Sequence, residues 1–310
     1  MKIAIFGSGG LGAYYGARFA ESGHQVSFIA RGAHLEALNK KGLTVFSPAG
    51  DLKLPEVTAT SEPAHLELQD LVIVAVKTWQ LESAAHSMAP LIGNNTMVCS
   101  FLNGVEAPDV LASVLGEQHI IGGLSRIFSK IEAPGVIRHF NDSAYVEFGE
   151  LSGESGTDRC VQLKDAFESA GVETVISDDI RLNLWRKLIL VSAWGGLGAL
   201  TRSTMGELRK HSETRELVTL CAQESQSVAH AEGHLFADDL IETMWTFYDA
   251  LPDAASTSLS RDILENKPSE LDAWHGVIVR LAERHGIEVP NQRFVYNALM
   301  PGARAADMAH

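Results

Sequence analysis

Three glycines near the start of the chain have the spacing of a dinucleotide-binding turn. They directly follow the apolar run 2–6 and form a G-x-G-x-x-G pattern. The first glycine of such a turn allows the tight change from strand to helix, the second lets the backbone approach a pyrophosphate, and the third lets the helix pack closely on the sheet. The N-terminus of the helix then attracts the phosphate charge. The pattern predicts a dinucleotide site made of Gly7, Ser8, Gly9, Gly10, Leu11 and Gly12.

Arg31 indicates which dinucleotide this site takes. It follows the second apolar run, 25–30, where NAD-binding proteins usually carry Asp or Glu to accept hydrogen bonds from the ribose 2′-hydroxyl. An arginine there suits a 2′-phosphate, because its guanidinium is permanently charged and offers a planar set of donors. The alternative is a solvated arginine at the end of a strand. We interpret the position as favouring NADPH over NADH.

Two polar residues follow later apolar runs. Lys77 comes after the run 71–76, and Asn103 comes after the run 97–101. Ligands of open α/β sheets lie beyond the carboxyl ends of the strands, so both side chains are expected near the bound ligand. Lys and Asn are also common in ordinary loops, and that interpretation stays open for each residue taken by itself.

Lys187 lies in the unusually apolar segment 184–191, which is expected to be helical. A buried or half-buried ammonium needs polar partners. If Lys187 faces a ligand crevice, it can protonate or polarise an oxygen that gains negative charge. The alternative is a lysine whose stem packs on the protein while its ammonium reaches water, and periodicity alone favours this alternative.

Other polar clusters have simpler interpretations. Hydroxyls and carboxylates gather at 257–262 and 269–272, around a loop and the start of a helix. Glu270 and Asp272 in a first helical turn complement the helix dipole, so the pattern alone does not predict catalysis. His230 and His234 are four residues apart but lack the H-E-x-x-H pattern, and an intervening glycine weakens the helix. We interpret these histidines as binding no metal.

The composition excludes several classes of function. The 310 residues are 45% hydrophobic and 21% charged, which is typical of a globular protein, and their formal net charge is −14. This negative charge disfavours a nucleic acid or an anionic membrane as a partner, because either would need a basic surface. Three widely spaced cysteines predict neither a zinc site nor a disulfide framework. With no targeting signal and no apolar stretch of about 18 residues, we expect a cytoplasmic protein.

A parallel sheet is needed to position these side chains. Short, nearly continuous apolar runs alternate with helical patterns up to about residue 123, which predicts strands buried on both faces. Alternating patterns at 135–140 and 144–149 predict antiparallel strands that extend one edge of the sheet. From about residue 180 onward the patterns are helical. We therefore predict an α/β fold: a Rossmann-type doubly wound sheet over residues 1–178, followed by an all-helical domain over 179–310.

Taken together, these segments resemble the ketopantoate reductase family, also called 2-dehydropantoate 2-reductases, nearly from end to end. The segments that carry the resemblance are the glycine turn 7–12, Phe28–Gly32, Val76–Thr78, Asn103–Val105, Phe148–Glu150, Trp185–Leu188, Ser258–Asp262, Ser269–Asp272, Gly276 and His285–Pro290.

The resemblance implies that the chain uses NADPH to reduce a small 2-keto acid, foremost 2-dehydropantoate to pantoate in pantothenate biosynthesis. It implies that Lys187 is the catalytic lysine and that Lys77 lies at the cofactor. It also implies that Glu270 assists substrate binding, and that Asn103 and Ser258 hold the keto acid, with Asn103 near the cofactor as well. Assembly differs among family members, and a homodimer is one option.

Two positions depart from the family pattern. Family members acting on ketopantoate commonly carry asparagines one and two helical turns beyond the catalytic lysine, and this chain has Val191 and Gly195 there. The spacing of four and eight residues from Lys187 keeps both positions near one face of the helix. A reductase of another branched, aromatic or otherwise apolar 2-keto acid is therefore the first alternative. A catalytically silent NADPH-sensing protein is the second.

Overall fold

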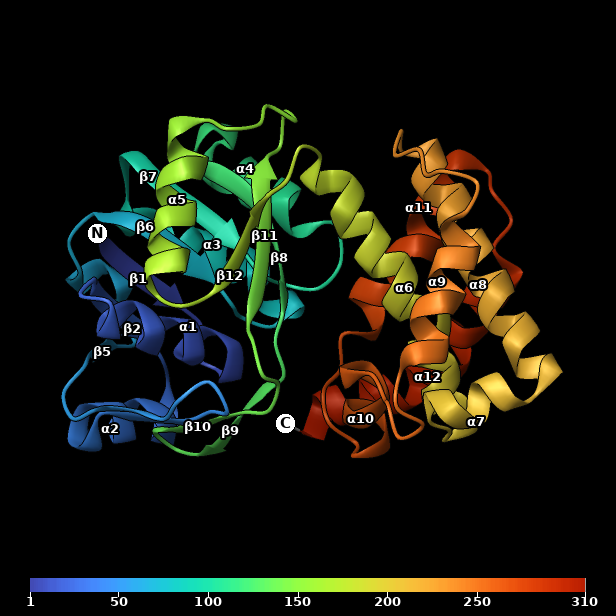
Figure 1. Cartoon of the computed structure of the whole chain (residues 1–310), viewed down its shortest axis with the longest axis horizontal. Helices are drawn as coiled ribbons and strands as arrows, with labels where there is room; N and C mark the ends of the chain where they lie inside the picture. Colours follow the sequence, from blue (N-terminus) through green and yellow to red (C-terminus); the bar gives the residue numbers. More distant parts are fainter. Residues whose placement is uncertain (310) are drawn as a thin grey trace. The chain divides into compact units, whose positions relative to one another are not determined.

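The short apolar runs of the sequence form the strands of one eight-stranded sheet (Figure 1). The structure is a computed structural model that describes residues 1–309. In chain order the strands are β1 (Lys2–Phe6), β2 (Gln25–Ile29), β5 (Thr58–Thr60), β6 (Gln69–Val74), β7 (Ile92–Ser100), β8 (Ile120–Arg126), β11 (Tyr145–Glu150) and β12 (Glu173–Ile176). Their spatial order is β12-β11-β8-β7-β6-β1-β2-β5, and the six strands from β8 to β5 run parallel.

Helices cover both faces of this sheet, which explains why its strands are apolar at successive positions. In β1, Ile3 and Ile5 belong to a core that includes α1 (Gly10–Glu21) and α5 (Asp158–Ser169). The alternate residues Ala4 and Phe6 belong to a second core, formed with α3 (Leu81–Met88) and α4 (Ala107–Leu115). Successive side chains of a strand point to opposite faces, so both faces of β1 are buried. The predicted doubly wound sheet is confirmed.

The prediction for the edge of the sheet is half right. The segment 144–149 forms β11, which pairs antiparallel with β8, as predicted. The segment 135–140 does not join this edge. Its strand β10 (Val136–His139) lies in a separate four-stranded sheet of order β4-β3-β10-β9, with β3 (Leu43–Phe46), β4 (Leu52–Leu54) and β9 (Ser129–Ala133). Alternation shows that one face of a strand is buried, but it does not specify the partner strand.

From residue 181 to residue 309 the described chain contains helices and no strand, as predicted. The helices are α6 (Ile180–Thr201), α7 (Met205–Lys210), α8 (Ser212–Ala231), α9 (Leu240–Ala250), α10 (Ser258–Leu264), a π-helix (Asp272–Gly276), α11 (Val277–His285) and α12 (Pro290–Ala309). Helices α7 and α8 are separate, because His211 takes the extended conformation between them.

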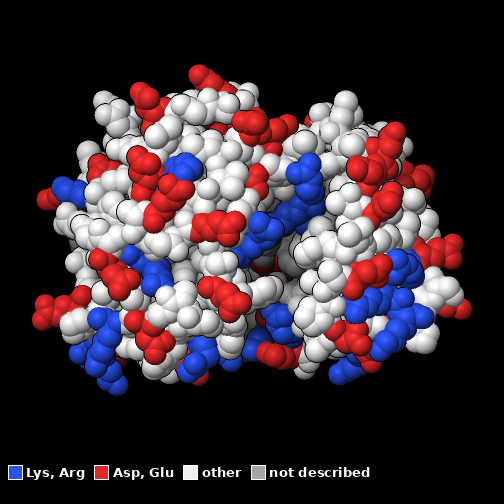
Figure 2. Space-filling view, viewed as in Figure 1, with Lys and Arg blue, Asp and Glu red and all other residues white. Residues whose placement is uncertain are grey.

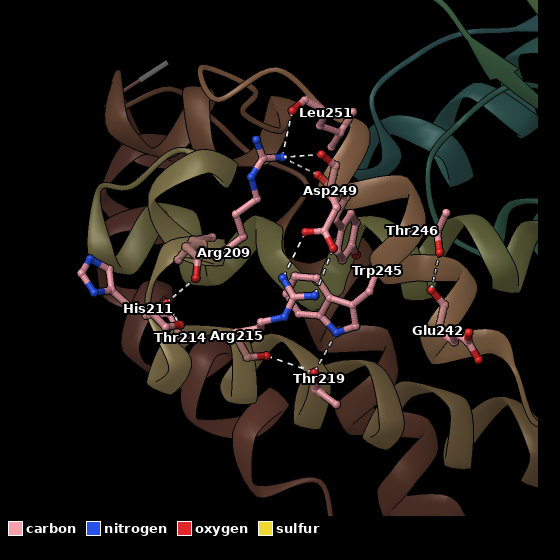
Figure 3. A network of polar contacts seen from close by, with 12 residues as sticks. Arg209, His211, Thr214, Arg215, Thr219, Glu242, Trp245, Thr246, Asp249 and Leu251 are labelled. Atoms are coloured by element: carbon pink, nitrogen blue, oxygen red, sulfur yellow. Dashed lines mark hydrogen bonds and ion pairs between the residues drawn. The ribbon is translucent and has the colours of Figure 1, made fainter.

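A polar network fixes the C-terminal end of α9 to α7 and α8 (Figure 3). Arg209 donates hydrogen bonds to the carbonyls of Tyr248 and Leu251, at 2.7 and 2.9 Å, which satisfies acceptors left open at the helix end. Arg215 binds the carboxylate of Asp249 through both terminal nitrogens, at 3.0 and 3.1 Å, and lies over the ring of Trp245. The same α9 segment holds α6, since the Tyr248 hydroxyl donates to the Leu190 carbonyl.

Contacts divide the chain into two compact units. Residues Met1–Leu102 and Ala107–Ile180 form the first unit, while Asn103–Glu106 belongs with the chain from Arg181 onward in the second. Figure 2 shows acidic side chains spread over the visible face of both units, in keeping with the net charge of −14. The cysteines, Cys99, Cys160 and Cys221, are buried free thiols. Within the described residues, no helix is long and apolar enough to cross a membrane.

Candidate functional site

The glycine turn lies between β1 and α1 in the first unit. Gly7 has φ of +103°, and a Cβ there would lie 2.7 Å from the backbone of Ala75. At Gly12 a Cβ would lie 2.2 Å from the carbonyl oxygen of Gly7. Both positions therefore exclude any other residue. At Gly9, the N-cap of α1, no described residue other than its two chain neighbours has an atom within 4 Å of the Cβ position, so the backbone is open to an approaching ligand.

Ser8 and Gly10 hold the turn in place. The Ser8 hydroxyl donates to the carbonyl of Ile29 in β2 at 3.0 Å, so this side chain points into the protein. A Cβ at Gly10 would lie 2.8 Å from the Cα of Lys130 and from the Ser129 carbonyl, because β9 of the second sheet packs against the turn. The G-x-G-x-x-G pattern gave no sign of this contact, which brings the backbone of a lysine to the turn.

Arg31 lies next to the turn, at the N-cap of α2 (Gly32–Lys41). It comes two residues after Ile29, whose carbonyl accepts hydrogen bonds from both the backbone and the side chain of Ser8. The Arg31 side chain is exposed and does not cap the helix. The backbone of Arg31 thus lies close to the glycine turn, and its exposed side chain is accessible to a ligand.

Lys77 lies shortly after the end of β6, whose following residue contacts the glycine turn. The backbone of Ala75 contacts Gly7, and Lys77 follows two residues later as the N-cap of a short 3-10 helix. Its side chain is exposed, and the ammonium lies 5.8 Å from the centre of the Trp79 ring. A cation above an aromatic face is attracted by the ring's negative potential, which limits the orientations of the lysine. The glycine turn, Arg31 and Lys77 therefore all lie just beyond the carboxyl ends of neighbouring parallel strands, β1, β2 and β6.

The second unit brings together two of the predicted substrate-binding residues. The Asn103 side chain donates to the Glu270 carboxylate at 2.8 Å, although 167 positions separate them in sequence. Glu270 is buried, with 9% of its surface exposed. A charge-assisted hydrogen bond of this kind stabilises an ionised carboxylate away from bulk water. The backbone is close as well, since a Cβ at Gly104 would lie 3.0 Å from the Ala273 carbonyl oxygen.

Asp272 has a different environment from Glu270. Its carboxylate accepts two hydrogen bonds from Arg280, at 2.8 and 2.9 Å, and one from the Tyr296 hydroxyl at 2.8 Å. Burial and the neighbouring Asp272 carboxylate raise the pKa of Tyr296 to about 12. Arg280 also binds Glu106, three residues after Asn103. Asp272 therefore helps to anchor the Asn103 segment through Arg280.

Helix α6 carries Lys187 and the two positions that depart from the family pattern. Lys187 and Val191 are half-buried, and Gly195 is buried. These residues are four apart, so they lie along one side of the helix. Gly195 is not an open space. A Cβ there would lie 3.0 Å from Cζ3 of Trp274 and 3.1 Å from Oγ1 of Thr257, so other residues already fill the place of a side chain.

Ser258 is the first residue of α10, directly after that threonine. Thr257 is the N-cap of α10 and accepts from the Ser260 backbone at 3.0 Å, while the Ser260 hydroxyl donates to the Gly195 carbonyl at 2.6 Å. These bonds attach the start of α10 to α6. Ser258 itself is exposed at the beginning of the helix.

Two family models match this chain. Residues 3–153 match the ketopantoate reductase PanE/ApbA model, and residues 179–302 match the model of its C-terminal domain. The chain belongs to the ketopantoate reductase family. It is 32% identical to the 2-dehydropantoate 2-reductase of a Nostoc species, over 96% of this chain and 94% of the relative.

Solved structures agree with this assignment. A PanE/ApbA family ketopantoate reductase from Ralstonia eutropha superposes with a TM-score of 0.90 at 32% identity, covering 99% of this chain and 100% of the other. A D-mandelate dehydrogenase, solved with NADH and anilino(oxo)acetate, superposes with a TM-score of 0.89 at 24% identity over 99% of this chain and 100% of its own. At that identity the likeness concerns the fold alone.

The site residues of this ketopantoate reductase family member fall into two groups. In the first unit, the cofactor candidates are linked by the contacts that the glycine turn makes with Ile29 and Ala75. In the second unit, the substrate candidates are linked by the Asn103–Glu270 hydrogen bond and by the packing around Gly195. The sequence assigned no role at Gly195 to Trp274 or Thr257, which pack against it. Thr257 was noted only as part of a hydroxyl cluster, and an aromatic residue one helical turn after Glu270 is usually part of a core.

Proposed function

We propose that the chain reduces a 2-keto acid to a 2-hydroxy acid with NADPH, and that 2-dehydropantoate is its first candidate substrate. Ketopantoate reductases are NADPH-dependent oxidoreductases. The observation that carries the proposal is the hydrogen bond between Asn103 and Glu270. It joins the two polar residues to which the family resemblance assigns substrate contacts.

The residues of the first unit fit a dinucleotide phosphate. The N-terminus of α1 has an open backbone at Gly9 and no acidic residue in its first turn, so its partial positive charge is available to a pyrophosphate. Arg31 offers an exposed planar fork of donors to a 2′-phosphate, and Lys77 adds a second cation. In a chain of net charge −14, these local cations and the helix end must hold the anion. When bound, the nicotinamide supplies a hydride.

Lys187 provides the proton in this proposal. As hydride adds to the C2 carbonyl carbon, the C=O π bond breaks and its electron pair moves onto oxygen. The Lys187 ammonium stabilises that charge and transfers one proton to the oxygen, which gives the hydroxyl of the product. The neutral lysine then regains a proton from water. A half-buried lysine of an apolar helix is suited to this role, because a drier environment strengthens its attraction to the developing charge.

Asn103, Glu270 and Ser258 orient the keto acid in the same proposal. The Asn103–Glu270 bond leaves the second carboxylate oxygen of Glu270 as an acceptor for a substrate hydroxyl. Ser258, exposed at the start of α10, donates to a substrate oxygen. The hydrogen bond between Asn103 and Glu270 positions these two side chains, and the bonds of Thr257 and Ser260 position the backbone of Ser258, before substrate arrives.

A 2-keto acid with an apolar or branched tail is the second candidate substrate. The observation that favours it is the environment of α6 beyond Lys187. Val191 offers no hydrogen bond, and the place of a side chain at Gly195 is taken by Trp274 and Thr257. A site that binds a hydroxyl discriminates strongly against analogues without it, whereas an apolar surface discriminates weakly.

The test is turnover of a 2-keto acid panel, followed through the loss of NADPH absorbance. The panel contains 2-dehydropantoate, its analogue lacking the hydroxyl, and unbranched and aromatic 2-keto acids. Turnover of at least one supports the proposal, and the ratio of kcat/KM between the first two identifies the substrate type. Tight NADPH binding without any turnover would contradict it and would favour an NADPH sensor.

A further inference from the structure

Two adjacent aromatic side chains of the π-helix pack against two adjacent glycines of α6. Trp274 lies against Gly195, and His275 lies against Gly196, where a Cβ would be 2.5 Å from the imidazole Nε2. The wider turn of a π-helix changes the direction of the side chains that follow it, and such turns are frequent at functional sites. The two glycines of α6 therefore leave the room that the two rings occupy.

His275 fixes this arrangement. Its Nδ1 is 2.6 Å from Oε1 of Gln292, whose amide nitrogen donates to Ser225 Oγ and to the Cys221 carbonyl. Because that amide nitrogen is the donor, Oε1 is the acceptor and Nδ1 of His275 carries the proton. The π-helix is therefore held to α8 and α12 by a buried polar chain. Trp274, the preceding residue, has little freedom to move away from α6.

The Trp274 ring occupies the place of a side chain at position 195. A Cβ there would be 3.0 Å from Cζ3 and 3.3 Å from Cε3 of the indole, closer than side chains normally pack. The ring is 2% exposed, and its Nε1 makes no hydrogen bond to the described residues. Packing alone therefore positions the indole, and its surface beside α6 is apolar.

Trp274 and Gly195 both lie close in sequence to groups that the proposed function uses. Trp274 is one helical turn beyond Glu270, and Gly195 is about two turns beyond Lys187. The Trp274 backbone donates to the Glu270 carbonyl at 3.1 Å, so Trp274 lies one turn beyond Glu270, which directly precedes this helical segment. Gly195 follows Lys187 by eight residues, or about 12 Å along α6. Gly195 and Trp274 are both buried, so no solvent-filled gap separates the indole from α6 at this level of the helix.

We propose that Trp274 determines substrate specificity by limiting the length of the tail beyond the keto acid. The inference rests on the proposed function of the site. It defines the substrate class as 2-keto acids with an apolar tail of limited length, which ends against the indole. Close-packed interiors resist the insertion of extra methylenes, so a longer tail is excluded by overlap with the ring.

The experiment measures kcat/KM for a series of straight-chain 2-keto acids of increasing length. In the unchanged enzyme, kcat/KM should fall about tenfold or more when one methylene is added beyond the preferred length. Trp274→Leu should restore turnover of the longer acids and raise their kcat/KM relative to the shortest by about tenfold or more. Trp274→Phe, which keeps an aromatic ring but shortens it, should give an intermediate ratio.

Trp194→Leu is the matched control. Trp194 is the neighbour of Gly195 on α6 and is also buried, but its ring packs against Tyr248 of α9. The control variant should lower thermal stability without changing the selectivity for tail length. Equal ratios in the Trp274→Leu and Trp194→Leu variants would overturn the inference while leaving the proposed reductase intact.

If the Trp274 variants do not fold, the dependence of kcat/KM on tail length in the unchanged enzyme still tests the inference. Equal kcat/KM for short and long acids would overturn a length limit at Trp274. A sharp decrease at one length would support it. Failure of the proposed function looks different, because no 2-keto acid of any length would then be reduced.

Discussion

Arg31 provides the most specific prediction for the cofactor. Its side chain is exposed and does not cap α2, so Arg31→Ala should leave the fold intact while removing the guanidinium beside the glycine turn. A charge-assisted hydrogen bond contributes about 1.5–3 kcal/mol. Because water screens an exposed cation, we expect the lower end of that range, which corresponds to about a tenfold weaker Kd for NADPH. NADH lacks the 2′-phosphate, so its Kd should stay the same.

Calorimetric titration with each dinucleotide measures this difference. Lys40→Ala is a suitable control, because Lys40 is an exposed lysine of the same helix, paired with Glu36, and its loss changes the net charge equally. The effect of Arg31→Ala should also decrease at high salt, as expected for an exposed charge. An equal loss for NADPH and NADH, or an equal loss in the Lys40 variant, would refute the assignment of Arg31 to the 2′-phosphate.

Three further predictions concern the second unit. Lys187→Ala should lower kcat about 10²–10⁴-fold with little change in the Kd of NADPH, and near-normal turnover would remove the lysine from the chemistry. Glu270→Gln should mainly raise KM for the keto acid, and an unchanged KM would argue against substrate contact. Burial lowers the pKa of His275 from about 6.5 to about 4, so the folded state takes up this proton at a lower pH than the unfolded state does. His275 should therefore cost about 3 kcal/mol of stability as the pH falls from 7 to 4. Denaturant unfolding should show less loss over that range in His275→Gln.

The parts of the fold that depend on short stretches of sequence were predictable. The glycine turn, the buried parallel strands and the helical second half each follow from residue patterns over a few positions, and Arg31 and Lys77 follow from their place after strands. The second sheet was not predictable in the same way. Its strand β10 pairs with β3, some 90 residues earlier, and Val136 aligns with Thr44 in that pairing. An alternating pattern contains no information about such a distant partner.

The substrate candidates show the same limit. Glu270 alone was explained by the helix dipole, and only the folded chain brings Asn103 to its carboxylate. The sequence indicated that the place of the family's second asparagine side chain is vacant at Gly195. In the structure that space is filled by Trp274, because a π-helix directs two successive rings at two successive glycines. A helical period of 3.6 residues does not predict where a π-turn occurs.

Transfer of an isotopic label tests the central claim most directly. NADPH carrying deuterium at the transferable C4 position is incubated with the enzyme and its best 2-keto acid, and the product is analysed by mass spectrometry and NMR. Reduction as proposed gives a 2-hydroxy acid with one deuterium on C2, at a rate that falls about 10²–10⁴-fold in Lys187→Ala. Consumption of NADPH without deuterium at C2, or no reduction of any 2-keto acid, would contradict the proposed reaction.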